Sequence, residues 1–207
     1  MKLNLGAGSG WRKEGWTNLD LATKYDFNIK KLSPYENNSV KIIYSSHMIE
    51  HLPWSTVDLL LKDCARVLSS DGLFRLVIPD VDILNSILEN NDRAALEKDN
   101  YFYYNVGMGK NYTVEECVFE LFGYTTAGNS FINGTMHTAF FNFSIINIML
   151  RAAGFTVIER KSFADSEIKE LEETQYMNPE TGIIRSTSGF DNPATKGMSL
   201  YLECKIA

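Results

Sequence analysis

MKLNLGAGSG, residues 1–10, is the stretch that decides the fold of this chain. Lys2–Leu5 reads as a short strand, and glycines at alternate positions follow it at once: Gly6, Gly8 and Gly10. Because glycine has no Cβ, such a loop turns sharply and lets the backbone approach a ligand closely. A strand that runs into a glycine loop is typical of a nucleotide-type site in an α/β sheet, although glycines also serve as plain turns.

A second predicted strand, residues 16–20, ends in an acid suited to accept hydrogen bonds from both hydroxyls of a ribose. This acid, Asp20, lies 14 positions after Gly6, whereas a dinucleotide fold expects about 20 with a helix between them. Residues 11–17 show no helical period, so the helix that would receive a pyrophosphate is shortened or missing. The spacing favours a ligand with a ribose and no pyrophosphate. A plain turn or cap at Asp20 is the alternative.

Strands and helices alternate along the rest of the chain. Further strands are expected at 25–28, 40–44, 73–78, 155–159 and 198–205, and helices at 55–68, 81–89 and 144–154. This alternation implies right-handed crossovers and a mainly parallel sheet. Apolar residues in the helix that begins at Ser55 recur at helical spacing, which places Cys64 in the core.

Residues 81–140 interrupt this alternation with a stretch rich in aromatic residues and glycine. We interpret them as an inserted, substrate-covering segment at the carboxyl edge of the sheet, within a single domain of residues 1–207. A second small core is the alternative for most of the aromatic residues. Residues 162–197 read as a long acidic loop.

The composition indicates which kinds of partner and which cellular compartment to expect. The net charge of −6 disfavours nucleic acid as a partner, because such binding needs clustered lysines and arginines. Apolar runs all fall short of the roughly 18 residues of a membrane span. No signal peptide is expected, and three widely spaced cysteines fit a reducing, cytoplasmic location. The oligomeric state stays open.

Four segments, in this order along the chain, resemble the motifs of class I S-adenosylmethionine-dependent methyltransferases, and of their small methyltransferase type 11-like group in particular. They are the glycine-rich first motif at 3–10, the acidic second motif at 18–20, the fourth-strand segment at 43–52 and the helix–turn–strand at 66–75. The residues around 152–155 and 199–203 also resemble the family's last two strands.

The resemblance implies a Rossmann-like α/β fold: a mainly parallel sheet with an antiparallel last strand, a shortened first crossover and an insertion between strands five and six. It implies S-adenosyl-L-methionine as the cofactor. The residues that would hold it are Gly6, Ala7, Gly8 and Gly10 under the methionine part, Asp20 on the ribose, Leu21 on the adenine, Asp26 and Phe27 at the adenine edge, Ser45 and Ser46 at the sulfonium side, and Asn4.

Methyl transfer from a sulfonium is an in-line displacement, so the protein mainly aligns an acceptor and excludes water. We expect a small-molecule or glycan-type acceptor that is methylated on oxygen or nitrogen. His47 and His137 are the candidate catalytic bases, with a loop-orienting role as the alternative for His47. Glu50 and His51 are interpreted as structural residues bonded to the backbone. The spacing of histidines and acids predicts no metal site.

Two other functions compete with this hypothesis. An NAD-dependent sugar-nucleotide enzyme is disfavoured by the short spacing from Gly6 to Asp20 and by the lack of a helical Tyr-x-x-x-Lys motif. A non-catalytic module that binds S-adenosylmethionine or a protein partner would bind the cofactor without turnover. The acceptor and the methylated atom are left open by the sequence.

Overall fold

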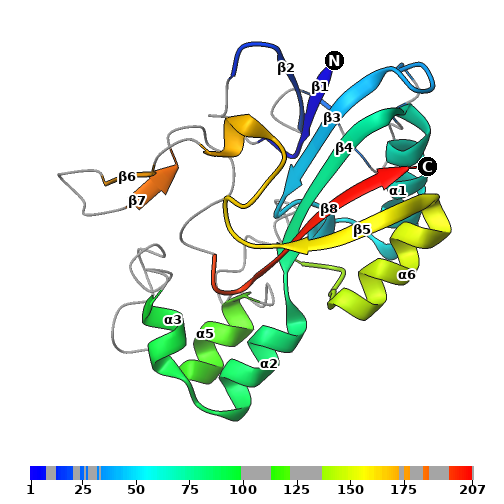
Figure 1. Cartoon of the computed structure of the whole chain (residues 1–207). Coiled ribbons are helices and arrows are strands. Elements are labelled where there is room, and N and C mark those ends of the chain that lie inside the picture. The colour runs from blue at the N-terminus through cyan, green and yellow to red at the C-terminus, as the bar shows by residue number, and fades with distance from the viewer. Residues whose placement is uncertain are drawn as a thin grey trace.

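The computed structural model describes residues 1–7, 13–20, 24–25, 27, 32, 34–98, 113–121, 137–172, 175–177, 184–186 and 196–206. Its main sheet has six strands in the order β2-β1-β3-β4-β8-β5 (Figure 1). The strands are β1 (Lys2–Leu5), β2 (Trp16–Leu19), β3 (Val40–Ser46), β4 (Leu68–Pro79), β5 (Phe155–Lys161) and β8 (Ser199–Ile206).

The four strands β2, β1, β3 and β4 run parallel to one another. Strand β8 inserts antiparallel between β4 and β5. The predicted Rossmann-like α/β sheet with an antiparallel last strand is therefore confirmed. Residues 13–15, the described part of the connection from β1 to β2, contain no helix, which agrees with the shortened first crossover.

One face of the sheet carries the main core. Its aliphatic and aromatic side chains pack against α1 (Trp54–Val67) and α6 (Phe143–Ala153), and Cys64 is fully buried among them as predicted. Asn142 caps α6 by accepting a hydrogen bond from the Ile145 amide at 3.0 Å. Gly154 ends this helix with a φ of +110°, a conformation that glycine adopts without strain.

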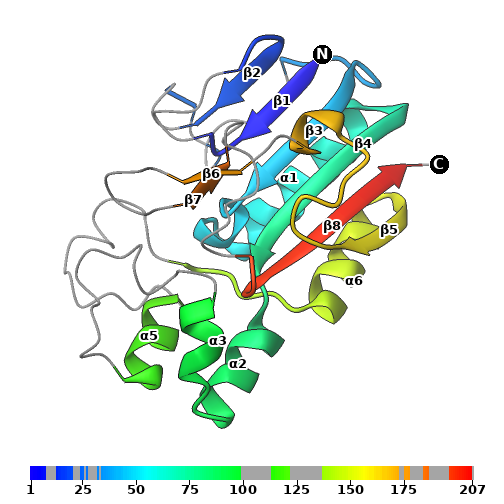
Figure 2. The same ribbon diagram turned by 60° about the vertical axis from the view of Figure 1, so that its left-hand side comes forward.

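The opposite face is covered by residues 162–172, which include the short 3-10 helix η3 (Lys169–Glu172), in gold in Figure 2. Phe163 and Ile168 pack there against Tyr44 and Tyr201. The acidic loop predicted from the sequence is thus partly a layer of the fold. It also contributes a two-stranded antiparallel pair, β6 (Gln175–Met177) and β7 (Ile184–Ser186).

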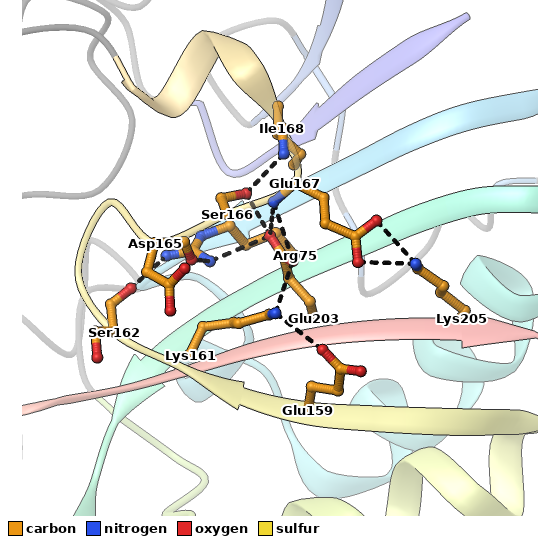
Figure 3. A network of polar contacts seen from close by, with 10 residues as sticks. All are labelled: Arg75, Glu159, Lys161, Ser162, Asp165, Ser166, Glu167, Ile168, Glu203 and Lys205. Carbon is orange, nitrogen blue, oxygen red and sulfur yellow. Dashed lines mark hydrogen bonds and ion pairs between the residues drawn. The ribbon is translucent and has the colours of Figure 1, made fainter.

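A buried ion pair holds this covering segment to the sheet (Figure 3). Arg75 on β4 and Glu203 on β8 are directly opposite in the register and almost fully buried, with Nη1 3.3 Å from Oε1. Arg75 also donates to the carbonyls of Ser162 and Asp165, at 3.0 and 2.8 Å. Glu203 accepts from the hydroxyl of Ser166 and from the amide of the next residue. One charge pair therefore docks the loop onto two strands.

Three helices lie beyond the carboxyl end of β4, away from both chain termini (Figures 1 and 2). They are α2 (Val81–Glu89), α3 (Arg93–Lys98) and α5 (Val114–Leu121), and they bury a cluster of their own that includes Leu84, Cys117 and Met198. Among the described residues, this cluster contains none of the aromatic residues for which a second small core was considered. Phe119 is 49% exposed, and the other aromatic residues of the insertion lie outside the described residues.

Three boundaries differ from the sequence prediction. Helix α1 begins at Trp54 after Pro53, so Ser55 is not its cap. Residues 69–72, predicted as a turn, belong to β4, because that strand starts at Leu68 directly after the helix. The irregular register between Val40 and Ile42 of β3 absorbs the additional residues. Tyr25 and Phe27, the described members of a predicted edge strand, are not in a strand.

Candidate active site

The candidate site lies where the parallel strands end. Leu5 pairs with Leu19 on one side and with Ser45 on the other, so the residues that follow β1, β2 and β3 gather at one edge. The amide of Gly6 donates to the carbonyl of Leu19 at 2.8 Å. The parallel register therefore brings the glycine loop and Asp20 together, as the sequence predicted. Carboxyl edges of this kind are where open α/β sheets bind ligands.

Gly6 cannot carry a side chain in this fold. Its φ is +77°, and an added Cβ would lie 2.2 Å from Cγ of Met48. The close approach of the segment after β3 therefore requires glycine at this position. Ala7 is half-buried and packs against the cluster around Tyr44. Gly8 and Gly10 lie outside the described residues.

Asp20 is half-buried, and its carbonyl accepts a hydrogen bond from the Tyr25 amide at 2.9 Å. This bond closes a turn directly after β2. The ring centroids of Phe27 and Tyr25 lie 5.0 Å apart, so two aromatic side chains pack together beside Asp20. Leu21 and Asp26 lie outside the described residues.

Two serines and one asparagine line the ends of the central strands. Ser45 is fully buried, and its hydroxyl has no hydrogen-bond partner among the described residues. Ser46 is half-buried at the end of β3. Asn4 is 3% exposed and sits one register position further back, between Asn18 and Tyr44.

These residues fit an S-adenosylmethionine molecule. The glycine that tolerates no Cβ, the carboxylate after β2 and the orphaned Ser45 hydroxyl are all at one edge of the sheet. A buried hydroxyl without a partner is rare unless a ligand or water completes it.

His47 has an unusual backbone and two side-chain contacts. Its φ of +48° places it in the left-handed region, which a non-glycine residue adopts at a cost. Its amide donates to the carbonyl of Val77 at 2.9 Å. The imidazole Nε2 lies 2.9 Å from Oγ of Ser199, and Nδ1 lies 3.3 Å from Oε1 of Glu50. Both ring nitrogens are thereby fixed, while the side chain keeps 26% of its surface exposed.

Glu50 is the buried centre of a group formed by every histidine in the chain. It belongs to the 3-10 helix η2 (Ile49–His51) and is 1% exposed. Burial alone would raise the pKa of its carboxyl. The nearby His47 imidazole and the positive potential of His51 and His137 outweigh burial and lower this pKa below its usual value. Glu50 is therefore ionised at neutral pH.

Glu50 is bonded to the backbone through its own carbonyl and not through its carboxylate. Its backbone carbonyl accepts from the amides of Thr138 and Ala139, at 2.7 and 3.0 Å. Its carboxylate oxygens have no well-aligned hydrogen-bond donor among the described residues and face histidines instead.

His137 reaches the same place from the far end of the insertion. Its ring centroid lies 4.7 Å from that of His51. The backbone bonds from Thr138 and Ala139 to Glu50 hold this returning segment beside η2. The fold thus brings both candidate bases, His47 and His137, close to one buried carboxylate.

Ser199 was not foreseen as a site residue. It is 6% exposed and pairs with Pro79 at the end of β4. An antiparallel last strand must begin at the edge where the neighbouring parallel strand ends. The first residue of the last predicted strand could therefore have been identified from the sequence as a residue near the site.

Asp80 caps helix α2. Its Oδ1 accepts from the Asp82 amide at 3.1 Å, and Arg160 lies 3.5 Å from its other oxygen. Burial raises the pKa of Asp80, reinforced by Asp82 and opposed by the capping bond and by Arg160.

Comparison with known proteins agrees with this geometry. Residues 3–76 match the family model described as a methyltransferase domain. A structure of an S-adenosylmethionine-dependent methyltransferase from Archaeoglobus fulgidus has a TM-score of 0.50 and 14% identity, over 99% of this chain and 85% of that one. No curated protein matches the sequence.

Two further similar structures have lower scores. An S-adenosylmethionine-dependent methyltransferase from Thermotoga maritima has a TM-score of 0.49 and 11% identity, over 100% of this chain and 81% of that one. Phosphoethanolamine N-methyltransferase 2 of Haemonchus contortus, in complex with S-adenosyl-L-methionine, has a TM-score of 0.47 and 12% identity, over 99% of this chain and 48% of that one.

The matched segment contains the glycine loop, Asp20, β3 and α1. This part of the chain is therefore similar to a methyltransferase domain, and the chain as a whole has the fold of the S-adenosylmethionine-dependent methyltransferase from Archaeoglobus fulgidus. The match to a methyltransferase domain supports transferase activity with S-adenosylmethionine as the cofactor. Among the described helices, none has the length and apolar composition that a membrane crossing requires.

Proposed function

We propose that this enzyme methylates an oxygen or nitrogen atom of a small-molecule or glycan-type acceptor, with His47 receiving the proton that the acceptor loses. One observation carries the proposal. His47 stands at the carboxyl end of β3, held by Ser199 on one ring nitrogen and facing the buried Glu50 on the other.

For the cofactor, we propose the set suggested by the resemblance. Gly6 and Ala7, continued by Gly8 and Gly10, would pass under the methionine part, while Asp20 would accept hydrogen bonds from the ribose. The other contacts would come from Asn4, Leu21, Asp26, Phe27, Ser45 and Ser46. When bound, S-adenosylmethionine supplies an activated methyl group on its sulfonium.

The residues around His47 suit a proton acceptor. The Ser199 hydroxyl, 2.9 Å from Nε2, limits rotation of the ring. The Glu50 carboxylate, 3.3 Å from Nδ1, stabilises the imidazolium that forms when a proton arrives. A base contributes typically 10²–10⁴-fold to a reaction that moves a proton. His137 is the second candidate and would approach the acceptor from the insertion.

The charge of the chain supports the proposed acceptor class. A net charge of −6 opposes the approach of nucleic acid. Helices α2, α3 and α5 stand beyond the carboxyl end of β4 (Figure 2), beside the edge where the acceptor must meet the methyl group. We propose that residues 81–140 cover the acceptor there.

The test uses methyl-labelled S-adenosylmethionine and separate panels of phenols, amines, oligosaccharides, peptides and RNA. We expect S-adenosylhomocysteine and a labelled product with one of the first three panels. Label transferred only to peptide or RNA would contradict the proposed acceptor class. With the acceptor that becomes labelled, His47→Ala is expected to lower turnover at least about 100-fold without weakening cofactor binding. His47→Gln cannot take a proton, so its turnover should be as low as that of His47→Ala. Full activity of His47→Ala would overturn the role of His47.

A further inference from the structure

The fold assembles a group of potential metal ligands that is dispersed in the sequence. One ligand atom each from Glu50, His51 and His137 lies within 4.8 Å of the other two. Glu50 and His51 are neighbours in η2, while His137 comes from the end of the insertion. The sequence spacing predicted no metal site because the third ligand is 86 positions away from the second.

From this geometry we infer that Glu50, His51 and His137 form a binding site for one divalent transition-metal ion of the zinc type. Two imidazoles and one carboxylate are an established ligand set for zinc sites that keep an open fourth position. Imidazole ligands favour zinc, cobalt or iron, whereas magnesium prefers oxygen ligands alone.

The carboxylate of Glu50 gives the second, independent observation. This side chain is 1% exposed, and neither of its oxygens has a well-formed hydrogen bond among the described residues. A buried carboxylate normally acquires a full set of partners, because an unpaired one is costly. An ion at this position would complete it.

The distances require only a local adjustment. Ligand atoms bonded to a tetrahedral zinc ion at 2.0–2.2 Å are separated by roughly 3.3–3.6 Å. The ligand atoms of the three residues now lie within 4.8 Å of one another, and they would reach this separation if the side chains moved by about an ångström. The backbone anchors are already in place, since Thr138 and Ala139 bond to the Glu50 carbonyl.

His47 would orient the Glu50 carboxylate without itself binding the ion. Its Nδ1 faces Oε1 of Glu50, which leaves the second carboxylate oxygen for the ion. Carboxylate ligands of metals are commonly oriented by a neighbouring polar group of this kind. The half-buried His51 and His137 leave the group accessible from solvent, so the fourth position is open to water or to an acceptor oxygen.

The test is direct metal binding by the full chain after treatment with a chelator. Titration calorimetry with Zn²⁺ should give one site per chain. Co²⁺ should produce the visible absorption of a nitrogen- and oxygen-ligated four- or five-coordinate ion, and Zn²⁺ should displace it. Mg²⁺ should not compete. Because no acceptor or cofactor is present, the outcome does not depend on the proposed methyl transfer.

Variants assign the ligands. We expect His51→Ala, His137→Ala and Glu50→Gln each to weaken Zn²⁺ binding by more than about 100-fold, and His47→Ala, an outer partner, to weaken it less. The matched acid control is Asp58→Asn, because Asp58 is an exposed carboxylate paired with Lys62, and it should bind as the wild type does. Circular dichroism of each variant reports whether it is folded.

Two results would overturn the inference. One is the absence of saturable one-to-one Zn²⁺ binding to the folded wild type, which would mean that the histidines only neutralise Glu50. The other is Zn²⁺ binding that survives in both His51→Ala and His137→Ala, which would place the ion elsewhere. If His137→Ala fails to fold, His137→Gln tests the same ligand with less loss of volume.

Discussion

Nδ1 of His47 lies 3.3 Å from Oε1 of the fully buried Glu50. The two residues are three positions apart, and the left-handed backbone at His47, with φ +48°, turns the chain between β3 and η2. A strained backbone persists only where the surrounding contacts determine it. Here those contacts are the Val77 carbonyl, Ser199 and Glu50, and the result is an imidazole fixed at the carboxyl edge of the parallel strands.

The Ser199 contact predicts a selective effect on turnover. In Ser199→Ala the imidazole loses its Nε2 partner and gains rotational freedom. We expect kcat to fall roughly 10-fold, a part of what a positioned base contributes, with the affinity for S-adenosylmethionine unchanged. Ser39→Ala is the control, since Ser39 bonds only the Glu36 carbonyl in an exposed turn. Equal kinetics for the two variants would show that Ser199 does not position His47.

Substitutions at Gly6 and Gly15 form a matched pair that tests the close contact between Gly6 and Met48. Both have a φ near +77°, but a Cβ at Gly15 meets nothing within 4 Å, whereas at Gly6 it would collide with Met48. Alanine at either site carries a backbone cost of about 1–2 kcal/mol. We expect Gly6→Ala to lose about 1–3 kcal/mol more in the free energy of unfolding, measured in urea. If both variants lose the same amount, Met48 does not press on Gly6.

The Arg75–Glu203 pair predicts a large loss of stability when only one partner is removed. Arg75→Met removes the nearer charge partner of buried Glu203 and leaves Lys161 at 4.0 Å, and it should cost about 3–5 kcal/mol of unfolding free energy. The double variant Arg75→Met with Glu203→Leu should recover most of this loss, because no isolated charge remains. A double variant as unstable as Arg75→Met would show that the carbonyl bonds from Arg75 to the loop, and not the ion pair, stabilise the fold.

The raised pKa of Asp80 predicts that substitution of this residue changes the stability of the fold by an amount that depends on pH. Burial raises its pKa in the folded protein, so ionised Asp80 destabilises the fold, and this penalty is relieved as pH falls through the raised pKa. Asp80→Asn keeps a capping oxygen and should be more stable than the wild type at pH 7, with the difference shrinking in acid.

Asp80→Ala is the companion variant. It removes the charge together with the cap, which is worth about 1 kcal/mol, and should be less stable than Asp80→Asn at every pH. Thermal unfolding between neutral and acidic pH measures both variants. A constant difference between Asp80→Asn and the wild type across this range would contradict a raised pKa.

The parts of the site that depend on parallel strands were predictable from the sequence. Gly6 and Asp20 each follow a short strand directly, and parallel strands end at the same edge. Their proximity therefore required only that β1 and β2 be recognised as neighbours. The sheet type followed from the alternation of strands and helices.

The remaining parts depend on long-range packing that local pattern does not encode. The meeting of Glu50 with His137 depends on where the insertion re-enters the sheet edge, and nothing near His137 specifies that path. Arg75 and Glu203 stand in strands that read as ordinary buried segments, and their pairing depends on the register of β4 with β8. The strand start at Leu68 was missed because Ser69, Ser70, Asp71 and Gly72 favour a turn, and pairing with β3 overrides that preference.

Cofactor binding by the wild type and by Asp20→Ala tests the central claim most directly. Titration calorimetry should show that the wild type binds S-adenosylmethionine and S-adenosylhomocysteine but not NAD. Asp20→Ala should lose about 10–100-fold in affinity for both, since hydrogen bonds to a charged group contribute about 1.5–3 kcal/mol, while its unfolding curve stays that of the wild type. Binding of NAD without either S-adenosyl compound would contradict the account.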